Sequence, residues 1–262
     1  MERHFCLDDS PTFRMIRLDE VDSTNNYLRR LDAPGDSRMT LVTAEYQTAG
    51  RGADTNRWES ARGENLLLSL RVMPSRLPAD RMFAISEATA MALVTALTSS
   101  LPPAPSPAPF TIKWPNDIYF GDSKVAGILI ENDLQGATVL RSTIGIGINV
   151  NQRHFVSDAP NPRSLADIVG HDVERRLVLE SFMLHFTRRM RQIDEGDLDT
   201  LHEDYKHHLY RLHEEHEYID TGGRFRATLI NVEPSGHLVL RDTEGRLRRY
   251  AFKEVRFLIN PL

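Results

Sequence analysis

The chain has 262 residues, of which 40% are hydrophobic and 26% are charged, and its formal net charge is −5. This composition is typical of a folded globular protein and excludes disordered, collagen-like and disulfide-rich chains. The single cysteine, Cys6, cannot form an internal disulfide, and the negative net charge argues against a protein that coats nucleic acid. The polar N-terminus lacks the apolar core of a signal peptide, and no long uninterrupted apolar run indicates a membrane span. We therefore expect a soluble, cytoplasmic protein.

The chain up to residue 101 alternates strand and helix patterns. Apolar residues at every second position indicate strands, and apolar residues three and four positions apart indicate helices. In chain order these patterns predict a strand over 13–21, a helix over 22–31, strands over 41–44 and 65–72, and a long core helix over 80–101. At the start of the first helix, the side-chain oxygens of Asp22 to Asn25 are expected to accept hydrogen bonds from the free amides of its first turn.

The next part of the chain begins with five prolines between residues 102 and 109, which lack the amide hydrogen that a sheet needs and predict a surface loop. The strand-like runs that follow are separated by only a few residues, which favours antiparallel hairpins. The patterns predict strands over 111–114, 118–120, 125–131 and 138–150, and then helices over 164–169, 175–193 and 197–212. The expected fold of residues 1–215 is α+β, a mixed, mainly antiparallel sheet with helices gathered on one side.

The C-terminal part of the chain has a different pattern, with short alternating runs between glycine and proline turns. Strands are predicted over 224–232, 237–240, 247–252 and 255–259. We expect residues 216–262 to form a small antiparallel barrel. Such a short segment has a small core, so it is expected to pack against the larger part.

Three segments carry residue types that could bind an anion or line a ligand site. Gly50-Arg51-Gly52 sets a permanent cation between glycines that let a ligand approach the backbone, and a plain glycine turn is the alternative. Lys113-Trp114-Pro115-Asn116-Asp117, followed by Lys124, could neutralise phosphoryl charge and hold Mg²⁺, or could be a solvated surface turn. In Gly145-Ile146-Gly147-Ile148-Asn149 both glycines share one face of a strand, which indicates either a bulge or a ligand against the backbone.

Other chemistries have weaker support. His213-Glu214-Glu215-His216 lacks the spacing of a zinc-binding His-Glu-x-x-His motif, so a solvated surface is favoured over a metal site. The sequence has no complete dinucleotide fingerprint, no P-loop and no nucleophile elbow.

Five segments together resemble biotin protein ligases, and they occur in the same order. They are Val21 to Asn25, Glu45 to Gly52, Lys113 to Asp117, Lys124 to Glu131 and Gly145 to Asn149. The resemblance is dense from Leu18 to Asn151 and looser toward the C-terminus. It implies a catalytic domain over residues 1–215, an antiparallel sheet flanked by helices with the biotin/lipoate ligase fold related to class II aminoacyl-tRNA synthetases, and an SH3-like barrel over residues 216–262.

The resemblance also implies a reaction. Such an enzyme uses ATP with Mg²⁺ to activate biotin as biotinyl-5'-AMP, releases pyrophosphate, and transfers biotin to a lysine of the apo biotin carboxyl carrier domain of a carboxylase. Biotin and Mg-ATP are substrates, and no permanently bound cofactor is expected. Neither DNA nor a membrane is expected as a partner, and the sequence leaves the choice between monomer and homodimer open.

The resemblance assigns roles to residues that match the family motifs. The catalytic residues would be Lys124, Arg51 and Asp117, and Asp117 would also be the candidate Mg²⁺ ligand. Biotin would contact Ser23, Thr24, Asn25, Gln47, Gly50, Arg51, Gly52, Lys124, Gly127, Gly145 and Gly147. The nucleotide would contact Arg51, Trp58, Lys113, Asn116, Asp117, Lys124 and Asn149.

Two departures from the family pattern carry expectations. Ala53 stands where many members have a second arginine, so release of the adenylate is expected to be easier than in those members. The match begins near Leu18, which leaves no room for the helix-turn-helix domain of the repressor members, so no operator binding is expected.

Two other functions are the alternatives. One is a lipoate or octanoate ligase or transferase, whose Arg-Arg-x-x-Gly-Gly stretch is missing, and the other is a catalytically silent module that only binds biotin.

Overall fold

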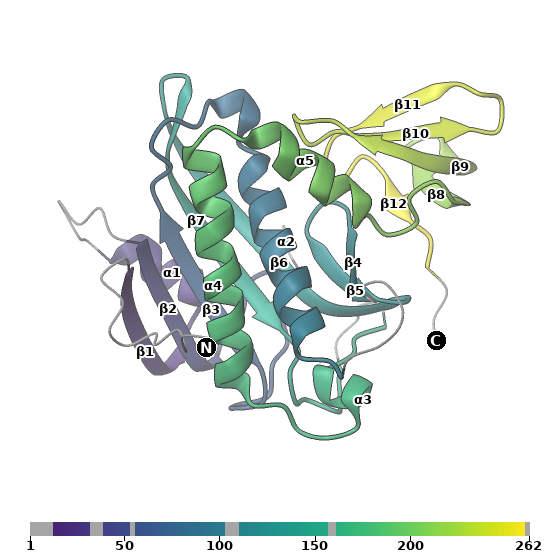
Figure 1. Ribbon diagram of the computed structural model, residues 1–262. Coiled ribbons are helices and arrows are strands. Elements are labelled where there is room, and N and C mark those ends of the chain that lie inside the picture. Colours follow the sequence, from purple (N-terminus) through teal and green to yellow (C-terminus); the bar gives the residue numbers. More distant parts are fainter. Residues whose placement is uncertain (1–12, 32–38, 53–55, 103–109, 157–160, 260–262) are drawn as a thin grey trace.

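A seven-stranded sheet forms the centre of the computed structural model, which describes residues 13–31, 39–52, 56–102, 110–156 and 161–259 (Figure 1). The strand order is β1-β2-β3-β7-β6-β5-β4, with β1 parallel to β2 and all other neighbours antiparallel. The strands are β1 (Phe13–Val21), β2 (Met39–Gln47), β3 (Leu66–Val72), β4 (Phe110–Lys113), β5 (Asp117–Phe120), β6 (Ser123–Gln135) and β7 (Thr138–Ile148). The prediction of a mixed, mainly antiparallel sheet is confirmed.

The helices cover both faces of this sheet, so the expectation that they gather on one side is wrong. The long helices α2 (Ala84–Ser99) and α4 (Arg175–Asp194) lie side by side on one face (Figure 1), and the apolar side chains of Leu68 and Leu70 in β3 belong to the core that they share. Ser69 points the other way, because successive strand residues alternate between faces. Its hydroxyl contacts the short helix α1 (Thr24–Arg30), which therefore lies on the opposite face.

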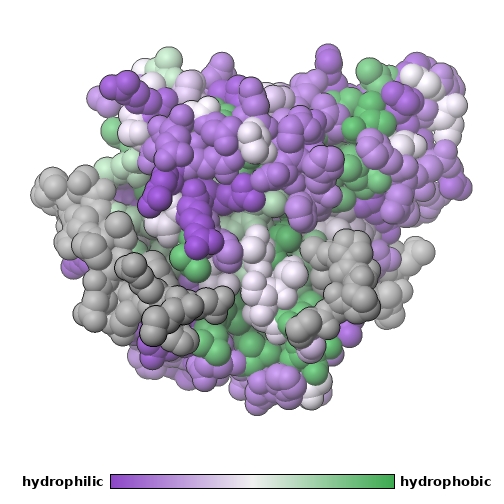
Figure 2. All heavy atoms as spheres, viewed as in Figure 1, coloured by the Kyte–Doolittle hydropathy of each residue, from purple (hydrophilic) through white to green (hydrophobic). Residues whose placement is uncertain are grey.

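Helix α2 is apolar on almost every side because it is buried between α4 and the sheet. Together with the 3₁₀ turn η1 (Ala79–Arg81), it lies in a segment, Ala79–Ser99, that is long and apolar enough to cross a membrane by length and composition. In this protein 67% of its most apolar window is buried, which is the pattern of a core helix. The face of the molecule that carries α4 is mainly hydrophilic (Figure 2).

Helices α3 (Leu165–Val169) and α5 (Leu198–His207) complete the larger part. A capping box starts α3, since the Ser164 hydroxyl accepts from the Asp167 amide and the Asp167 carboxylate accepts from the Ser164 amide. Helix α5 ends five residues before the predicted 212. The helix ends early because the chain pairs with another segment: the amide of Ile112 in β4 donates to the carbonyl oxygen of His208, and the amide of Tyr210 donates to that of Ile112.

The C-terminal strands form a five-stranded antiparallel sheet in the order β11-β10-β9-β8-β12. They are β8 (Glu215–Asp220), β9 (Gly223–Val232), β10 (Leu238–Asp242), β11 (Leu247–Tyr250) and β12 (Arg256–Phe257). This is consistent with a small SH3-like domain, although β11 and β12 are not paired to close it. Strand β8 was not predicted, because Tyr218 is its single buried residue and it has no alternating pattern.

The C-terminal sheet packs against the larger part. The indole nitrogen of Trp114 donates a 2.9 Å hydrogen bond to the carbonyl oxygen of Gly236, and the rings of Trp114 and Phe252 meet edge to face at 6.4 Å. Gly236 also lies directly against the ring of Phe83, and its φ of +89° is a conformation that favours glycine.

Candidate active site

A cavity of about 580 Å³ opens on the α1 face of the sheet. Its lining contains every residue predicted for biotin, the nucleotide or catalysis except Gly50. Gly50 is buried against the backbone of Trp58 instead: its carbonyl oxygen accepts a hydrogen bond from the Trp58 amide, and a Cβ there would lie 2.5 Å from the Trp58 carbonyl oxygen. The sequence segments that were singled out separately therefore meet at one site.

The α1 end of the pocket is polar and densely hydrogen-bonded. The first-turn cap predicted for α1 is wrong, because the Ser23 side chain makes no capping bond. The side chain of Gln47, at the end of β2, takes that place and accepts from the Thr24 amide at 2.8 Å and from its hydroxyl at 3.1 Å. Ser69, which no sequence pattern indicated, also lies here: its buried hydroxyl contacts Thr24 Oγ1 at 2.7 Å and Asn25 Oδ1 at 2.5 Å.

The middle of the pocket is a trough floored by glycines of β6 and β7. Gly127 and Gly147 are paired across the two strands; a side chain at Gly147 would collide with the ring of Trp58, and one at Gly127 would press tightly against it. A Cβ at Gly147 would lie 2.2 Å from Trp58 Cε2, and one at Gly145 would lie 2.4 Å from Asn25 Oδ1. The prediction that one face of this strand is bare is confirmed, since the glycines leave room for Trp58 and Asn25.

Trp58 has a further property that points to a ligand. Its indole nitrogen is buried and has no hydrogen-bond partner, which is unfavourable unless another group supplies an acceptor.

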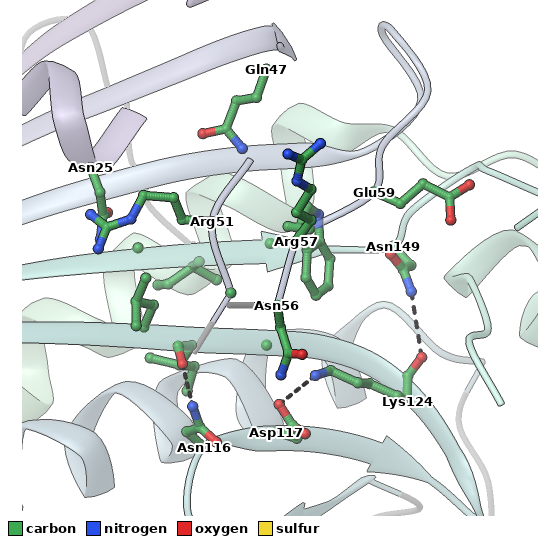
Figure 3. Close-up of a pocket in the computed structure, with 18 of the residues that line it drawn as sticks. Asn25, Gln47, Arg51, Asn56, Arg57, Glu59, Asn116, Asp117, Lys124 and Asn149 are labelled. Atoms are coloured by element: carbon green, nitrogen blue, oxygen red, sulfur yellow. Dashed lines mark hydrogen bonds and ion pairs between the residues drawn. The ribbon is translucent and has the colours of Figure 1, made fainter. Parts of the chain in front are cut away.

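The other end of the pocket carries charge. Lys124 Nζ lies 2.7 Å from Asp117 Oδ1, with both side chains less than one-fifth exposed, and 5.8 Å from the centre of a Trp58 ring. Asn116 Nδ2 donates to the carbonyl oxygen of Ile128, and Asn149 Nδ2 donates to that of Lys124 (Figure 3). Preorganised cations and amides of this kind can stabilise charge that develops on a phosphoryl group.

Lys113 lines the same end, with its ammonium 5.1 Å from the ring centre of Phe257 in the C-terminal sheet. Burial lowers the pKa of Lys113; Asp117 opposes this shift, while Lys124 and Arg211 add to it. Burying the charged Lys113 ammonium therefore lowers the stability of the folded protein.

Replacing Lys113 with methionine is expected to raise the free energy of unfolding by about 1 kcal/mol at pH 7, because an apolar side chain avoids the cost of burying a charge. The gain should shrink as the pH approaches the ordinary lysine pKa of about 10.4. Over that range the unfolded chain binds more protons than the folded protein, so wild-type stability rises with pH. Urea unfolding at pH 7 and pH 10 measures both effects. The control is Lys206→Met, at an ion pair of α5, which should show neither the gain in stability at pH 7 nor its decrease at pH 10. Equal stability of wild type and Lys113→Met at pH 7 would contradict the prediction.

Arg51 does not face Lys124 and Asp117 in this structure. Its guanidinium binds both carboxylate oxygens of Glu131 and the side-chain oxygen of Asn26. Burial raises the pKa of Glu131, but hydrogen bonds and charge from Arg51, with the charge of Arg29, outweigh burial and lower it overall. Glu131 had no assigned role in the sequence analysis.

Several lining residues were given no role from the sequence, although Pro115, Ile128, Leu129 and Ile146 lie within the segments singled out there. They are Asn56, Arg57, Glu59, Leu68, Pro115, Ile128, Leu129, Ile146, Phe155, Pro162 and Phe252. Phe252 is the most distant in sequence, and it reaches the pocket from the turn between β11 and β12. Ala53, on which the expectation of easier adenylate release rests, lies outside the described residues.

The described part of the chain contains no group of three or more His, Cys, Asp or Glu side chains arranged to hold a metal ion. His216 pairs with Glu214 at 2.9 Å.

The comparisons with known proteins identify the family. The model of the biotin/lipoate A/B protein ligase family matches residues 18–149, the range that holds all the predicted site residues. Over 234 residues the chain is 31% identical to the biotin–[acetyl-CoA-carboxylase] ligase of Paracoccus denitrificans, covering 87% of this chain and 95% of that protein. The chain belongs to the biotin/lipoate A/B protein ligase family.

Further relatives agree on the branch of this family. The bifunctional ligase/repressor BirA of Bacillus subtilis is 27% identical over 242 residues, which cover 90% of this chain and 72% of that protein. The biotin protein ligase of Aquifex aeolicus, solved in complex with biotin and ATP, superposes with a TM-score of 0.74 at 25% identity and covers 94% of this chain and 99% of its own. The prediction of a biotin protein ligase, in enzyme class and in fold, is confirmed.

Proposed function

We propose that this biotin ligase activates biotin with Mg-ATP and transfers it to a lysine of a carboxylase carrier domain. In the first step an oxygen of the biotin carboxylate attacks the α-phosphorus, giving biotinyl-5'-AMP and pyrophosphate. In the second, the lysine amine attacks the acyl carbon and AMP leaves. The observation that carries the proposal is a single pocket with a hydrogen-bonding end, a glycine trough and a charged end.

The pocket suggests which substrate group lies where. The cyclic urea of biotin needs matched donors and acceptors, which Ser23, Thr24, Asn25 and Gln47 supply at the α1 end. The valeryl chain would lie beside the Trp58 ring along the trough of Gly127, Gly145 and Gly147, with Gly50 and Gly52 in the loop that carries Trp58.

The charged end would receive the reacting groups. Lys124 would stabilise the negative charge that grows on the α-phosphate, and Asp117 would orient Lys124 and serve Mg²⁺ or the incoming lysine. Lys113, Asn116, Asn149 and Trp58 would border the nucleotide. We further propose residues 1–215 as the catalytic domain, residues 216–262 as the small domain, and the cytoplasm as the compartment.

Exchange of radiolabelled pyrophosphate into ATP tests the first step. We expect exchange with biotin and none with lipoate, octanoate or no added acid. Exchange with only lipoate or octanoate would show that the enzyme is a lipoate or octanoate ligase of the same family. No exchange with any of these acids would contradict adenylation. Incorporation of biotin into an apo carrier domain then tests the second step, and light scattering decides between monomer and homodimer.

A further inference from the structure

Glu131 stands at the end of a row of residues on the pocket face of β6. Gly127 and Leu129 line the pocket, and Glu131 follows two residues later on the same face, next to α1. Its carboxylate receives hydrogen bonds from side chains of α1 and of the ligand loop. The row therefore continues from the trough into an ionic cluster.

Four donor atoms converge on this carboxylate. Arg51 binds it with two parallel bonds of 3.1 Å each, Arg29 donates at 2.9 Å and Asn25 donates at 3.2 Å. The two bonds from Arg51 form the planar, two-pronged geometry that makes arginine a strong partner for carboxylates. These bonds occupy the Nη1–Nη2 edge of the guanidinium, so an anion that binds Arg51 at this edge has to displace Glu131.

Figure 3 shows the guanidinium of Arg51 pointing away from the pair formed by Lys124 and Asp117. To bind an anion beside Lys124, Arg51 has to give up its bonds to Glu131. That exchange does not leave Glu131 unpaired, because Arg29 and Asn25 remain bonded to it. The side chains of Arg51 and Glu131 are 38% and 24% exposed, so water can reach the pair while it opens.

We propose that Glu131 is the internal counter-ion of Arg51 and competes with anionic ligands for it. Glu131 is thus a positioning residue that sets how tightly the carboxylate of the substrate and the phosphate of the adenylate are held. The proposal rests on the proposed function, which identifies these ligands as biotin and biotinyl-5'-AMP. Because the competition is electrostatic, Glu131 should weaken the binding of an anionic ligand and leave a neutral ligand of the same shape unaffected.

The test compares biotin with biotin amide, which has the same ring and chain but no negative charge. Titration calorimetry on Glu131→Gln should show biotin bound roughly two- to five-fold more tightly than by wild type, the range expected for a partly exposed ion pair. Binding of the neutral amide should be unchanged. Glu131→Asp keeps the charge and should keep the wild-type ratio of the two affinities.

The matched control is Glu45→Gln, which removes the charge from a 3.0 Å ion pair with Arg175 away from the pocket and should leave both affinities unchanged. If Glu131→Gln shifts biotin and its amide equally, or weakens biotin, Glu131 only supports the structure and the proposal is overturned. Pyrophosphate exchange with biotin, measured in wild type and in Glu131→Gln, separates the failure of this inference from that of the proposed function. If both proteins exchange and the affinities are unchanged, only the role of Glu131 is overturned. If wild type shows no exchange, the proposed function is overturned.

Discussion

Lys124→Ala is expected to lower the rate constant of biotin adenylation by about 100-fold or more, because it removes a preorganised cation from the charged end of the pocket. Lys124 lies 2.7 Å from Asp117 and is mostly buried, so water cannot readily replace its ammonium. The loss should appear in kcat for pyrophosphate exchange. The Michaelis constant for biotin should change much less, since the ring-binding residues lie at the other end.

Lys206→Ala is the matched control for this variant. Lys206 forms a 2.7 Å ion pair with Glu203 on α5, and its loss should leave adenylation unchanged. Thermal melting of both variants checks that each folds. If Lys124→Ala adenylates biotin at nearly the wild-type rate, Lys124 has no role in stabilising the transition state.

Gly147→Ala is expected to raise the Michaelis constant for biotin by roughly ten- to a hundred-fold, because its added methyl group would enter the trough 2.2 Å from Trp58. The indole has to shift, and the shift fills the space proposed for the valeryl chain. Steady-state kinetics with biotin varied at saturating ATP measures the effect.

Ile144→Val on the same strand provides the control. Ile144 is fully buried on the opposite face, so it should lose about 1 kcal/mol of stability with no change in the Michaelis constant. An unchanged Michaelis constant in Gly147→Ala would show that biotin does not lie along the glycines.

The parts of the site that could be predicted from sequence are those in which one short segment carries the signal. Gly145 and Gly147 share a face by the two-residue period of a strand, and Lys113 to Asp117 were grouped because they adjoin in sequence. The resemblance to biotin protein ligases added the substrate, which neither periodicity nor charge supplies.

The parts that could not be predicted depend on contacts between distant segments. Gln47 caps α1 from 23 residues away, and Glu131 binds Arg51 across 80 residues of chain. Strand β8 and the early end of α5 also follow from pairing with neighbours, which overrides local preference. Such partners become visible only once the sheet has brought them together.

The contact between Trp114 and Gly236 makes the two sheets interdependent. Trp114 adjoins Lys113 of the pocket wall, and Phe252 and Phe257 of the C-terminal sheet pack on this same stretch. Losing the smaller sheet would expose the buried indole of Trp114 to water and remove the Phe257 ring that lies over the Lys113 ammonium. We therefore expect the binding site and the C-terminal sheet to unfold together, so that a ligand bound beside Lys113 also stabilises C-terminal residues that it does not contact.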